Sequence, residues 1–365
     1  MSRILHLIVP AFALLLAACS TVEERKPFDG PLSWPQPPDQ PRFAYETMLR
    51  SAADIAFVSE ETSLRAALTG VSAVSDKPVM DKPSAIVARN GKIYVADTGS
   101  NTIIVFDVPS RKVFRFGIRE PGNLAKPAGL AMDEKMNIYV ADSIRRMIIV
   151  YDGFGLFLRM LGSPDDLERP TGVAVSRDGE RIYVIDRSYN ESENHHVVVY
   201  DKAGKKLQVI GSRGNGDGQF NVPLQGAVAP DGTLYVLDSG NFRVQAFDRD
   251  GKFLRSFGNP GKEFGNFGRP RGITVDDDGL VYVTDANFNN FQIFNPEGHL
   301  LLAIGQPSLE SNPGQYGMLN GIAVDETRRV YVVDQLYNKV EVIRRLTESE
   351  GQQMLKEAQM KKKAN

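Results

Sequence analysis

The pentapeptide Ile93-Tyr94-Val95-Ala96-Asp97 decides the fold, because it returns five times along the chain with conservative changes. The later copies occupy residues 138–142, 182–186, 234–238, 281–285 and 330–334, and successive aspartates are 45, 44, 52, 47 and 49 residues apart. Periods of this length are typical of β-propellers, in which each repeat forms one four-stranded blade. Six copies therefore predict an all-β chain with six blades.

The residues around each pentapeptide supply the other strands of a blade. Pro-x-Gly triplets precede it at residues 127–129, 170–172 and 270–272, and Asn-Gly or Asp-Gly pairs then predict tight hairpins. The fourth unit differs, since residues 223–226 read Pro-Leu-Gln-Gly. The extra residue before the glycine predicts a β-bulge in that blade.

Ring closure is predicted from a strand that has no neighbour in the sequence. Five units end in a fourth strand, but the sixth runs from Arg345 into a helix start. Residues 42–50 alternate apolar and polar side chains, as a half-buried strand does. We expect this strand to complete blade six and to close the ring, which removes exposed sheet edges.

These patterns define the domain organisation. The propeller is expected over residues 42–346, with a connector at residues 51–81 that contains a short helix at residues 62–69. A capping box of Thr347 and Glu350 begins a helical tail over residues 347–365.

The N-terminal segment is typical of an exported protein. Residues 1–18 contain one cation, Arg3, and then an apolar run that is too short to span a bilayer comfortably. Residues 16–19, Leu-Ala-Ala-Cys, resemble the bacterial lipobox, and this resemblance implies lipidation of Cys19. By the same resemblance, Ser20 favours transfer to the outer membrane, with the periplasmic or surface side left open.

The next segment is expected to hold the domain away from the lipid. Residues 19–41 are polar and proline-rich, so they predict an extended tether. Trp34 lies within it, and we expect its side chain to pack onto the domain in preference to the membrane interface.

Composition excludes one class of function. The chain of 365 residues is 42% hydrophobic and 24% charged, with a formal net charge of −2. These values are ordinary for a folded protein and argue against a general nucleic-acid binder.

The units resemble those of the NHL-repeat family, whose pattern is a Gly-rich loop, Phe, Pro-x-Gly, an Asp-Gly turn and Tyr-Val-x-Asp. The best copies are residues 211–248 and 258–295, and the resemblance covers residues 82–344. The pattern is not that of a WD repeat, because the single tryptophan lies outside the array. The resemblance implies a propeller, but NHL propellers include binding platforms and a few enzymes with a histidine-held metal in the channel.

Two sets of residues are candidates for chemistry. The six recurring aspartates are interpreted as acceptors of backbone hydrogen bonds, because a catalytic group is not needed once per blade. An insertion in the third unit, residues 187–196, carries four weak candidates for metal ligands, namely Glu191, Glu193, His195 and His196. Since adjacent residues of a strand point to opposite faces, we expect no metal site there, and we expect no cofactor.

Charge differs between the two expected faces of the propeller. The loops on one face carry a set of basic residues that we predict to bind a partner: Lys126, Arg145, Arg146, Arg169, Arg187, Arg243, Arg269 and Arg271. The turns on the other face carry Asp133, Glu134, Asp178, Asp231, Asp250, Asp276, Asp277, Asp278, Asp325 and Glu326. A positive rim around a channel attracts an anionic partner, although a merely solvated face stays open at this point.

The sequence thus predicts a lipid-anchored scaffold of the bacterial envelope, with a protein or anionic polymer bound on the basic face. The membrane would be reached through the lipid on Cys19. Two alternatives stay open: a lyase or lactonase-like enzyme centred on the channel, and a structural subunit of an envelope complex.

Overall fold

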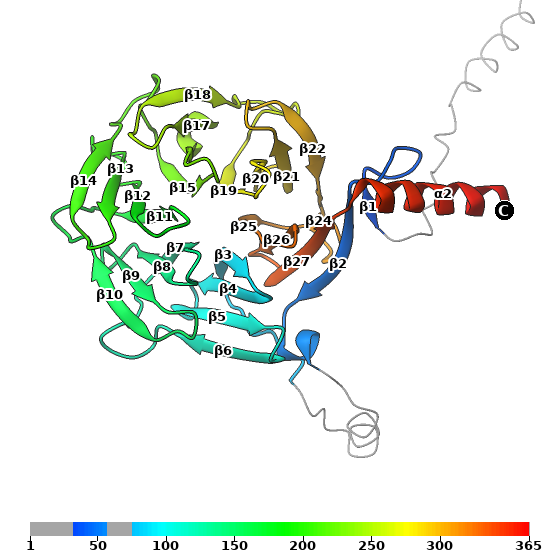
Figure 1. The fold of residues 1–365 in the computed structure, drawn as a ribbon, viewed down its shortest axis with the longest axis horizontal. Helices are drawn as coiled ribbons and strands as arrows, with labels where there is room; N and C mark the ends of the chain where they lie inside the picture. Colours follow the sequence, from blue (N-terminus) through cyan, green and yellow to red (C-terminus); the bar gives the residue numbers. More distant parts are fainter. Residues whose placement is uncertain (1–31, 57–74, 365) are drawn as a thin grey trace, which may run out of the picture. The chain divides into compact units, whose positions relative to one another are not determined.

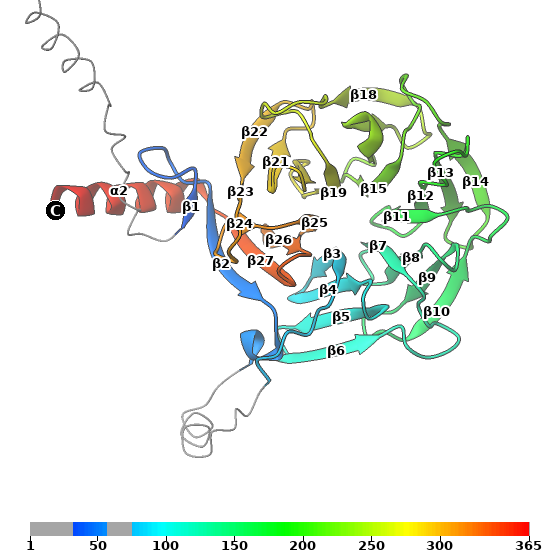
Figure 2. The ribbon, with the colours of Figure 1, turned by 180° about the vertical axis from the view of Figure 1, so that it is seen from behind.

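A computed structural model of the chain describes residues 32–56 and 75–364, and these residues form a ring of sheets (Figure 1; Figure 2 from behind). The expected signal peptide, Cys19, the first part of the tether and the helix at residues 62–69 lie outside the described residues. None of the described helices has the length and apolar character that a membrane crossing requires.

Each blade is an antiparallel sheet, and in blades one to five the innermost strand comes first in the sequence. Blade one contains β3 (Pro83–Arg89), β4 (Lys92–Asp97), β5 (Thr102–Asp107) and β6 (Lys112–Phe116), and blade two contains β7 (Pro127–Met132), β8 (Ile138–Asp142), β9 (Met147–Tyr151) and β10 (Phe157–Leu161). Blade three contains β11 (Pro170–Val175), β12 (Arg181–Asp186), β13 (His196–Asp201) and β14 (Lys206–Ile210). Blade four contains β15 (Pro223–Val228), β16 (Leu234–Asp238), β17 (Arg243–Phe247) and β18 (Phe253–Phe257), with a short 3₁₀ turn, η2 (Ser239–Asn241). Blade five contains β19 (Pro270–Val275), β20 (Val281–Asp285), β21 (Asn290–Phe294) and β22 (Leu300–Ile304).

Blade six joins the two ends of the propeller, as the sequence predicts. Its order is β1 (Ser33–Trp34), β2 (Phe43–Leu49), β27 (Lys339–Arg345), β26 (Arg329–Asp334) and β25 (Leu319–Val324). The β2–β27 register runs from Phe43 opposite Arg345 to Leu49 opposite Val340. The predicted closing strand is therefore confirmed.

The segment expected as a tether contributes to this blade. Trp34 pairs with Phe43 in the register of β1 and β2, and it packs against the core between blades five and six. The prediction that Trp34 packs onto the domain is confirmed.

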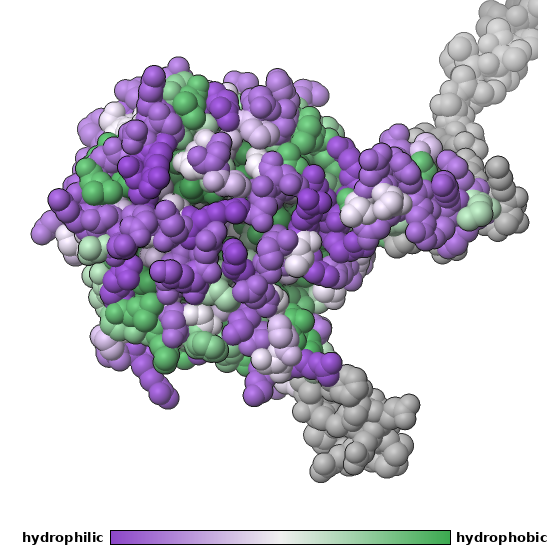
Figure 3. Space-filling model, in the orientation of Figure 1, coloured by the Kyte–Doolittle hydropathy of each residue, from purple (hydrophilic) through white to green (hydrophobic). Residues whose placement is uncertain are grey.

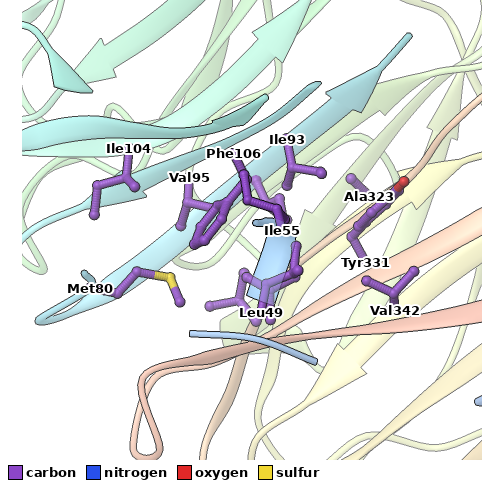
Figure 4. Close-up of a cluster of buried hydrophobic side chains, with 13 residues drawn as sticks. Leu49, Ile55, Met80, Ile93, Val95, Ile104, Phe106, Ala323, Tyr331 and Val342 are labelled. Atoms are coloured by element: carbon purple, nitrogen blue, oxygen red, sulfur yellow. The ribbon is translucent and has the colours of Figure 1, made fainter. Parts of the chain in front are cut away.

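The hydrophobic core is divided among the contacts between neighbouring blades. The central strands β8, β16 and β20 are buried along their whole length, because each is covered by a blade on either side. At the closure, Val95 and Phe106 of blade one pack with Leu49, Tyr331 and Val342 of blade six (Figure 4). Burying this set favours the closed ring over an open array.

The bulge predicted for blade four is present, but it does not distinguish that blade. The register between the first two strands shifts after Pro223, and it shifts at the same place after Pro127, Pro170 and Pro270. Gln225 pairs with Leu237 as Gly172 pairs with Ile185. Blade four therefore has no extra residue, and Gln225 replaces the glycine of the triplet.

The remaining elements are short, apart from one helix. These are η1 (Ala52–Ile55) and the parallel pair β23 (Gln306–Pro307) and β24 (Gln315–Tyr316). The helix α2 (Glu348–Ala364) begins with the predicted capping box: the Thr347 N–H donates to Glu350 Oε2 at 2.8 Å, and the Glu350 N–H donates to Thr347 Oγ1 at 3.3 Å.

Candidate functional site

The propeller has two different faces. We call the loop face the one that carries the leading loop before each innermost strand and the loop after each recurring aspartate. The turn face is the opposite one, which carries the hairpins between the first and second strands of each blade.

The recurring aspartates hold the loop face in shape. In blade five, Asp285 is fully buried and accepts the N–H groups of Gly268 (2.6 Å) and Arg269 from the leading loop, and of Asn287 (2.8 Å) and Phe288 from the following loop. Asp97, Asp142 and Asp334 each bridge the same two loops. The interpretation of these carboxylates as structural acceptors is confirmed.

Asparagines after these aspartates have a separate structural role. Asn101, Asn289 and Asn338 have φ values of 55°, 50° and 49°, in the left-handed region that asparagine tolerates better than most residues. The asparagine of the repeat is thus explained by the backbone of the loop.

Blade four departs from this arrangement. Its Asp238 accepts the Asn221 N–H at 2.7 Å, but the next N–H, that of Val222, donates to Nδ1 of His195 at 3.1 Å. Val222 has a φ of 52°, which is rare and strained for a β-branched residue. The insertion in blade three therefore holds a strained leading loop of blade four through a histidine.

The weak metal-ligand candidates are not brought together. Nδ1 of His195 accepts a hydrogen bond and Nε2 lies 3.1 Å from the Tyr189 carbonyl, so both ring nitrogens are engaged. Glu191 and Glu193 are exposed, and burial lowers the pKa of His196. No three His, Cys, Asp or Glu side chains lie close enough to hold a metal ion within the described part of the chain.

Two cavities lie along the innermost strands of the propeller. A cavity of about 180 Å³ toward the turn face is lined by the innermost strands, and a recess of about 30 Å³ lies toward the loop face. The recess is lined by polar groups of Ser84, Gln225, Arg271 and Asn320. Nε2 of Gln225 donates to the carbonyls of Ala128 (3.2 Å) and Thr171 (3.0 Å), so this side chain ties blade four to blades two and three.

Acidic groups of the turn face are largely used within the fold. Asp133 accepts the N–H groups of Lys135 and Asn137, each at 2.9 Å, and the hydroxyl of Tyr139 at 3.1 Å. Burial and then Asp133 raise the pKa of Tyr139 to about 12, so this hydroxyl stays a donor. Asp276 and Asp325 bind the tyrosines of blades five and six in the same way.

Arginines pair with other acids of the turn face. Arg177 of blade three pairs with Asp277 of blade five across the mouth of the channel cavity that both residues line. Further pairs are Arg181 with Asp250 (3.5 Å), Arg328 with Asp278 (3.4 Å) and Arg345 with Asp276 (3.1 Å). Much of the negative charge expected on this face is therefore neutralised locally.

Three of the eight predicted partner-binding cations are structural instead. Nε of Arg243 pairs with Asp238 at 2.9 Å, and its Nη2 donates to the Gly216 and Gln219 carbonyls. Nε of Arg146 donates to the Leu167 carbonyl at 3.0 Å. Arg145 binds Asn123 and Glu120 of its own leading loop. From the sequence these three cations cannot be distinguished from the other five, because a sequence does not show which side chains are paired.

The remaining cations are available. Lys126 is exposed, and Arg169, Arg187, Arg269 and Arg271 form no ion pair with any residue that the structure describes. Arg169 and Arg187 lie on blade three, and Arg269 and Arg271 lie on blade five. Burial and then the charge of Arg169 lower the pKa of Arg187.

The surface in Figure 3 is mainly hydrophilic, and its apolar side chains form separate patches. No single apolar area dominates the face shown there.

Comparison with known proteins agrees with this architecture. A sequence model described as NHL repeat matches residues 167–200 and 267–294, in blades three and five. Protein brain tumor of Drosophila melanogaster is 30% identical over 135 residues, which is 36% of this chain and 12% of that protein's length. The chain thus spans only a small part of this relative.

Solved structures with a similar fold include proteins of different activities. A Bacteroides thetaiotaomicron protein of unknown function has a TM-score of 0.58 at 17% identity, covering 74% of this chain and 71% of that one. A gluconolactonase from Xanthomonas campestris has a TM-score of 0.56 at 20% identity (73% and 87% covered). Virginiamycin B lyase from Staphylococcus aureus has a TM-score of 0.53 at 15% identity (73% and 97% covered). At these identities the likeness concerns the fold alone, and together with the matched repeats it identifies the chain as a six-bladed β-propeller with NHL repeats.

Proposed function

We propose that this chain is a binding module of the bacterial cell envelope, which is anchored by a lipid on Cys19 and holds a protein or polymer partner on its loop face. The proposal assigns no chemistry to the propeller itself. The observation that carries it is the unequal use of charge on the two faces.

On the turn face, arginines meet acids of the same chain, as in Arg181 with Asp250 and Arg345 with Asp276. On the loop face, two pairs of arginines have no such partner among the described residues. Keeping several like charges close together destabilises a fold, and such a cost is typical of binding surfaces.

The leading loops also suit a binding surface because they are rigid. In every blade except blade four, the loop is held by a buried carboxylate, such as Asp186 or Asp285, that accepts several backbone N–H groups. Little conformational entropy is then lost when a partner binds, which favours affinity.

The anchor is tested by replacing Cys19 with serine. The unchanged protein should be recovered with the outer-membrane fraction, and the Cys19→Ser protein should be recovered in the fraction that washes free of membrane. Equal membrane association of both proteins would contradict the lipid anchor.

The binding role is tested by cross-linking in intact envelopes, followed by mass spectrometry. Reproducible cross-links to one protein or polymer support the proposal. A propeller that recovers no partner, yet purifies with stoichiometric metal and turns over a lactone or cyclic ester, would instead support the channel-centred enzyme.

A further inference from the structure

The loop-face end of blade four differs from that of every neighbouring blade. The residue before the innermost strand is basic in blades one, two, three and five, at Lys82, Lys126, Arg169 and Arg269, but it is Val222 in blade four. Leu224 occupies the position that Arg271 has in blade five. Both apolar side chains are half-buried. Blade four thus presents an apolar surface where blades three and five present cations.

Cations flank this apolar surface on both sides. Arg169 and Arg187 belong to blade three, and Arg269 and Arg271 belong to blade five. Burial, then Arg269 and then Arg187 lower the pKa of Arg271. Together, Arg169, Arg187, Val222, Leu224, Arg269 and Arg271 are called the blade-four sector below.

One guanidinium in this sector is short of hydrogen-bond partners. Nε of Arg187 is buried and has no acceptor in the structure, and its Nη2 lies 3.5 Å from Oδ1 of Asn190, at the limit for a hydrogen bond. Buried donors in folded proteins nearly always have a partner, so this Nε can donate to a ligand or to a water molecule.

The backbone beneath the sector is held in place before any ligand binds. Asp186 accepts the Arg169 N–H at 2.8 Å, and Asp285 accepts the Arg269 N–H. His195 accepts the N–H of Val222, whose left-handed backbone is strained. Strain that is maintained by neighbouring contacts is common at binding sites.

We propose that the blade-four sector binds an acidic peptide segment, with carboxylates on the two arginine pairs and an apolar side chain against Val222 and Leu224. The planar guanidinium group suits this role, because it donates two parallel hydrogen bonds to one carboxylate. This inference rests on the proposed function, since it names the partner chemistry of the same face.

The charges around the sector favour a narrow peptide over a broad anionic surface. Glu191 and Glu193 of the blade-three insertion are exposed; the Glu193 side chain is 84% exposed and lies 3.9 Å from Arg213. A lipid bilayer or a uniformly charged polymer lying across the face would meet these carboxylates and be repelled. A peptide that passes over blade four meets the arginines and avoids the insertion.

The test measures binding of a fluorescent glutamate-rich peptide with a central leucine to the protein. The protein is purified from its host in its naturally processed form. The unchanged protein should bind this peptide at least tenfold more tightly than the same peptide with glutamine for glutamate. Arg187→Gln combined with Arg271→Gln should weaken binding of the acidic peptide by at least tenfold, as expected for loss of charge-assisted hydrogen bonds.

The matched control is Lys135→Gln combined with Lys205→Gln, which removes two exposed cations of the turn face. This control should leave binding unchanged. The arginine variant should melt no lower than the unchanged protein, because it removes two half-buried like charges, and so loss of binding is not loss of folding.

Three outcomes would overturn the inference: equal binding of the glutamine peptide, equal loss in the lysine control, or saturable binding of inorganic phosphate or phosphatidylglycerol vesicles in place of the peptide. If cross-linking still recovers a partner in any of these cases, the proposed function stands and the peptide chemistry fails. If no partner is recovered by either approach, the proposed function itself fails.

Discussion

The contact between blade six and its leading loop gives a sharp stability prediction. Lys339 and Glu341 are both fully buried, and Nζ of Lys339 lies 2.6 Å from Oε1 of Glu341. The ammonium also donates to the carbonyls of Gln315 (2.9 Å) and Asn312 (3.3 Å), and Glu341 Oε2 accepts the Gly314 N–H at 3.0 Å. The ion pair thus holds the leading loop against the blade.

Blades four and five make the same contact with one neutral side chain. In blade five, Oε1 of Gln292 accepts the Gly265 N–H at 2.6 Å and Nε2 donates to the Asn266 carbonyl at 2.9 Å. Gln245 does the same in blade four, at 2.9 Å and 2.7 Å. A glutamine at position 341 would therefore supply both hydrogen bonds without any charge.

Removing one member of the pair should be costly. Lys339→Met or Glu341→Gln alone leaves one buried charge without its partner, which costs about 3–5 kcal/mol. At roughly 2 °C per kcal/mol for a domain of this size, Tm should fall by about 6–10 °C. The double variant K339M/E341Q should recover to within about 1–2 °C of the unchanged protein, because glutamine reproduces the arrangement of blade five.

Differential scanning calorimetry of the four proteins at pH 7 measures these values. If the double variant melts as low as either single variant, then glutamine does not replace the ion pair, and the equivalence among the three blades is wrong. If the single variants do not change Tm, then the pair is not buried as described.

Three further predictions concern other parts of the propeller. Asp285→Ala should lower the free energy of unfolding by about 3–5 kcal/mol, because it leaves several loop N–H groups without an acceptor. Asp201→Ala in an exposed hairpin should lower it by only about 1 kcal/mol. Equal losses of stability in denaturant unfolding would contradict the role of the recurring aspartates. Val222→Asn should raise Tm by about 2 °C, since asparagine relieves about 1 kcal/mol of left-handed strain, and a lower Tm would refute the assignment of strain. Burial lowers the pKa of His196 below its unfolded value of 6.5, so the unfolded chain takes up a proton first and stability should fall as the pH drops below 6.5. His196→Asn should remove that part of the pH dependence in urea titrations, and an unchanged slope would contradict it.

Much of the fold was predictable because its determinants repeat. The pentapeptide, the hairpin turns and the unpaired strand at residues 42–50 are local patterns, and a closed ring leaves few other ways to use them. The role of the recurring aspartates followed from their number alone. The domain boundaries and the lipid anchor on Cys19 stay predictions.

The details of blade four were not predictable in the same way. The sequence showed an unusual triplet, but whether Gln225 is inserted or substituted depends on the strand register. His195 appeared as a metal candidate because residue type does not reveal that its Nδ1 accepts the Val222 N–H from another blade. Aligning the six units would have shown that Val222 replaces a basic residue, and this is the signal that was missed.

The arginines show the same limit. Arg243 and Arg271 are equally basic in the sequence, yet Arg243 is bound to Asp238 and Arg271 has no acidic partner among the described residues. Availability for a partner is a property of three-dimensional contacts. Lys339 and Glu341, by contrast, are visible in the sequence as two charges on one side of a buried strand, and Glu341 stands where blades four and five have Gln245 and Gln292.

The most direct test of the account is to map which lysines of the propeller cross-link to its partner in intact envelopes. The loop face offers Lys82 and Lys126, and the turn face offers Lys112, Lys135, Lys205 and Lys252, all of which are exposed. If the loop face binds the partner, we expect cross-links from Lys82 or Lys126 that disappear in the R187Q/R271Q variant. Cross-links confined to lysines of the turn face, unchanged in that variant, would contradict the central claim that the loop face binds the partner.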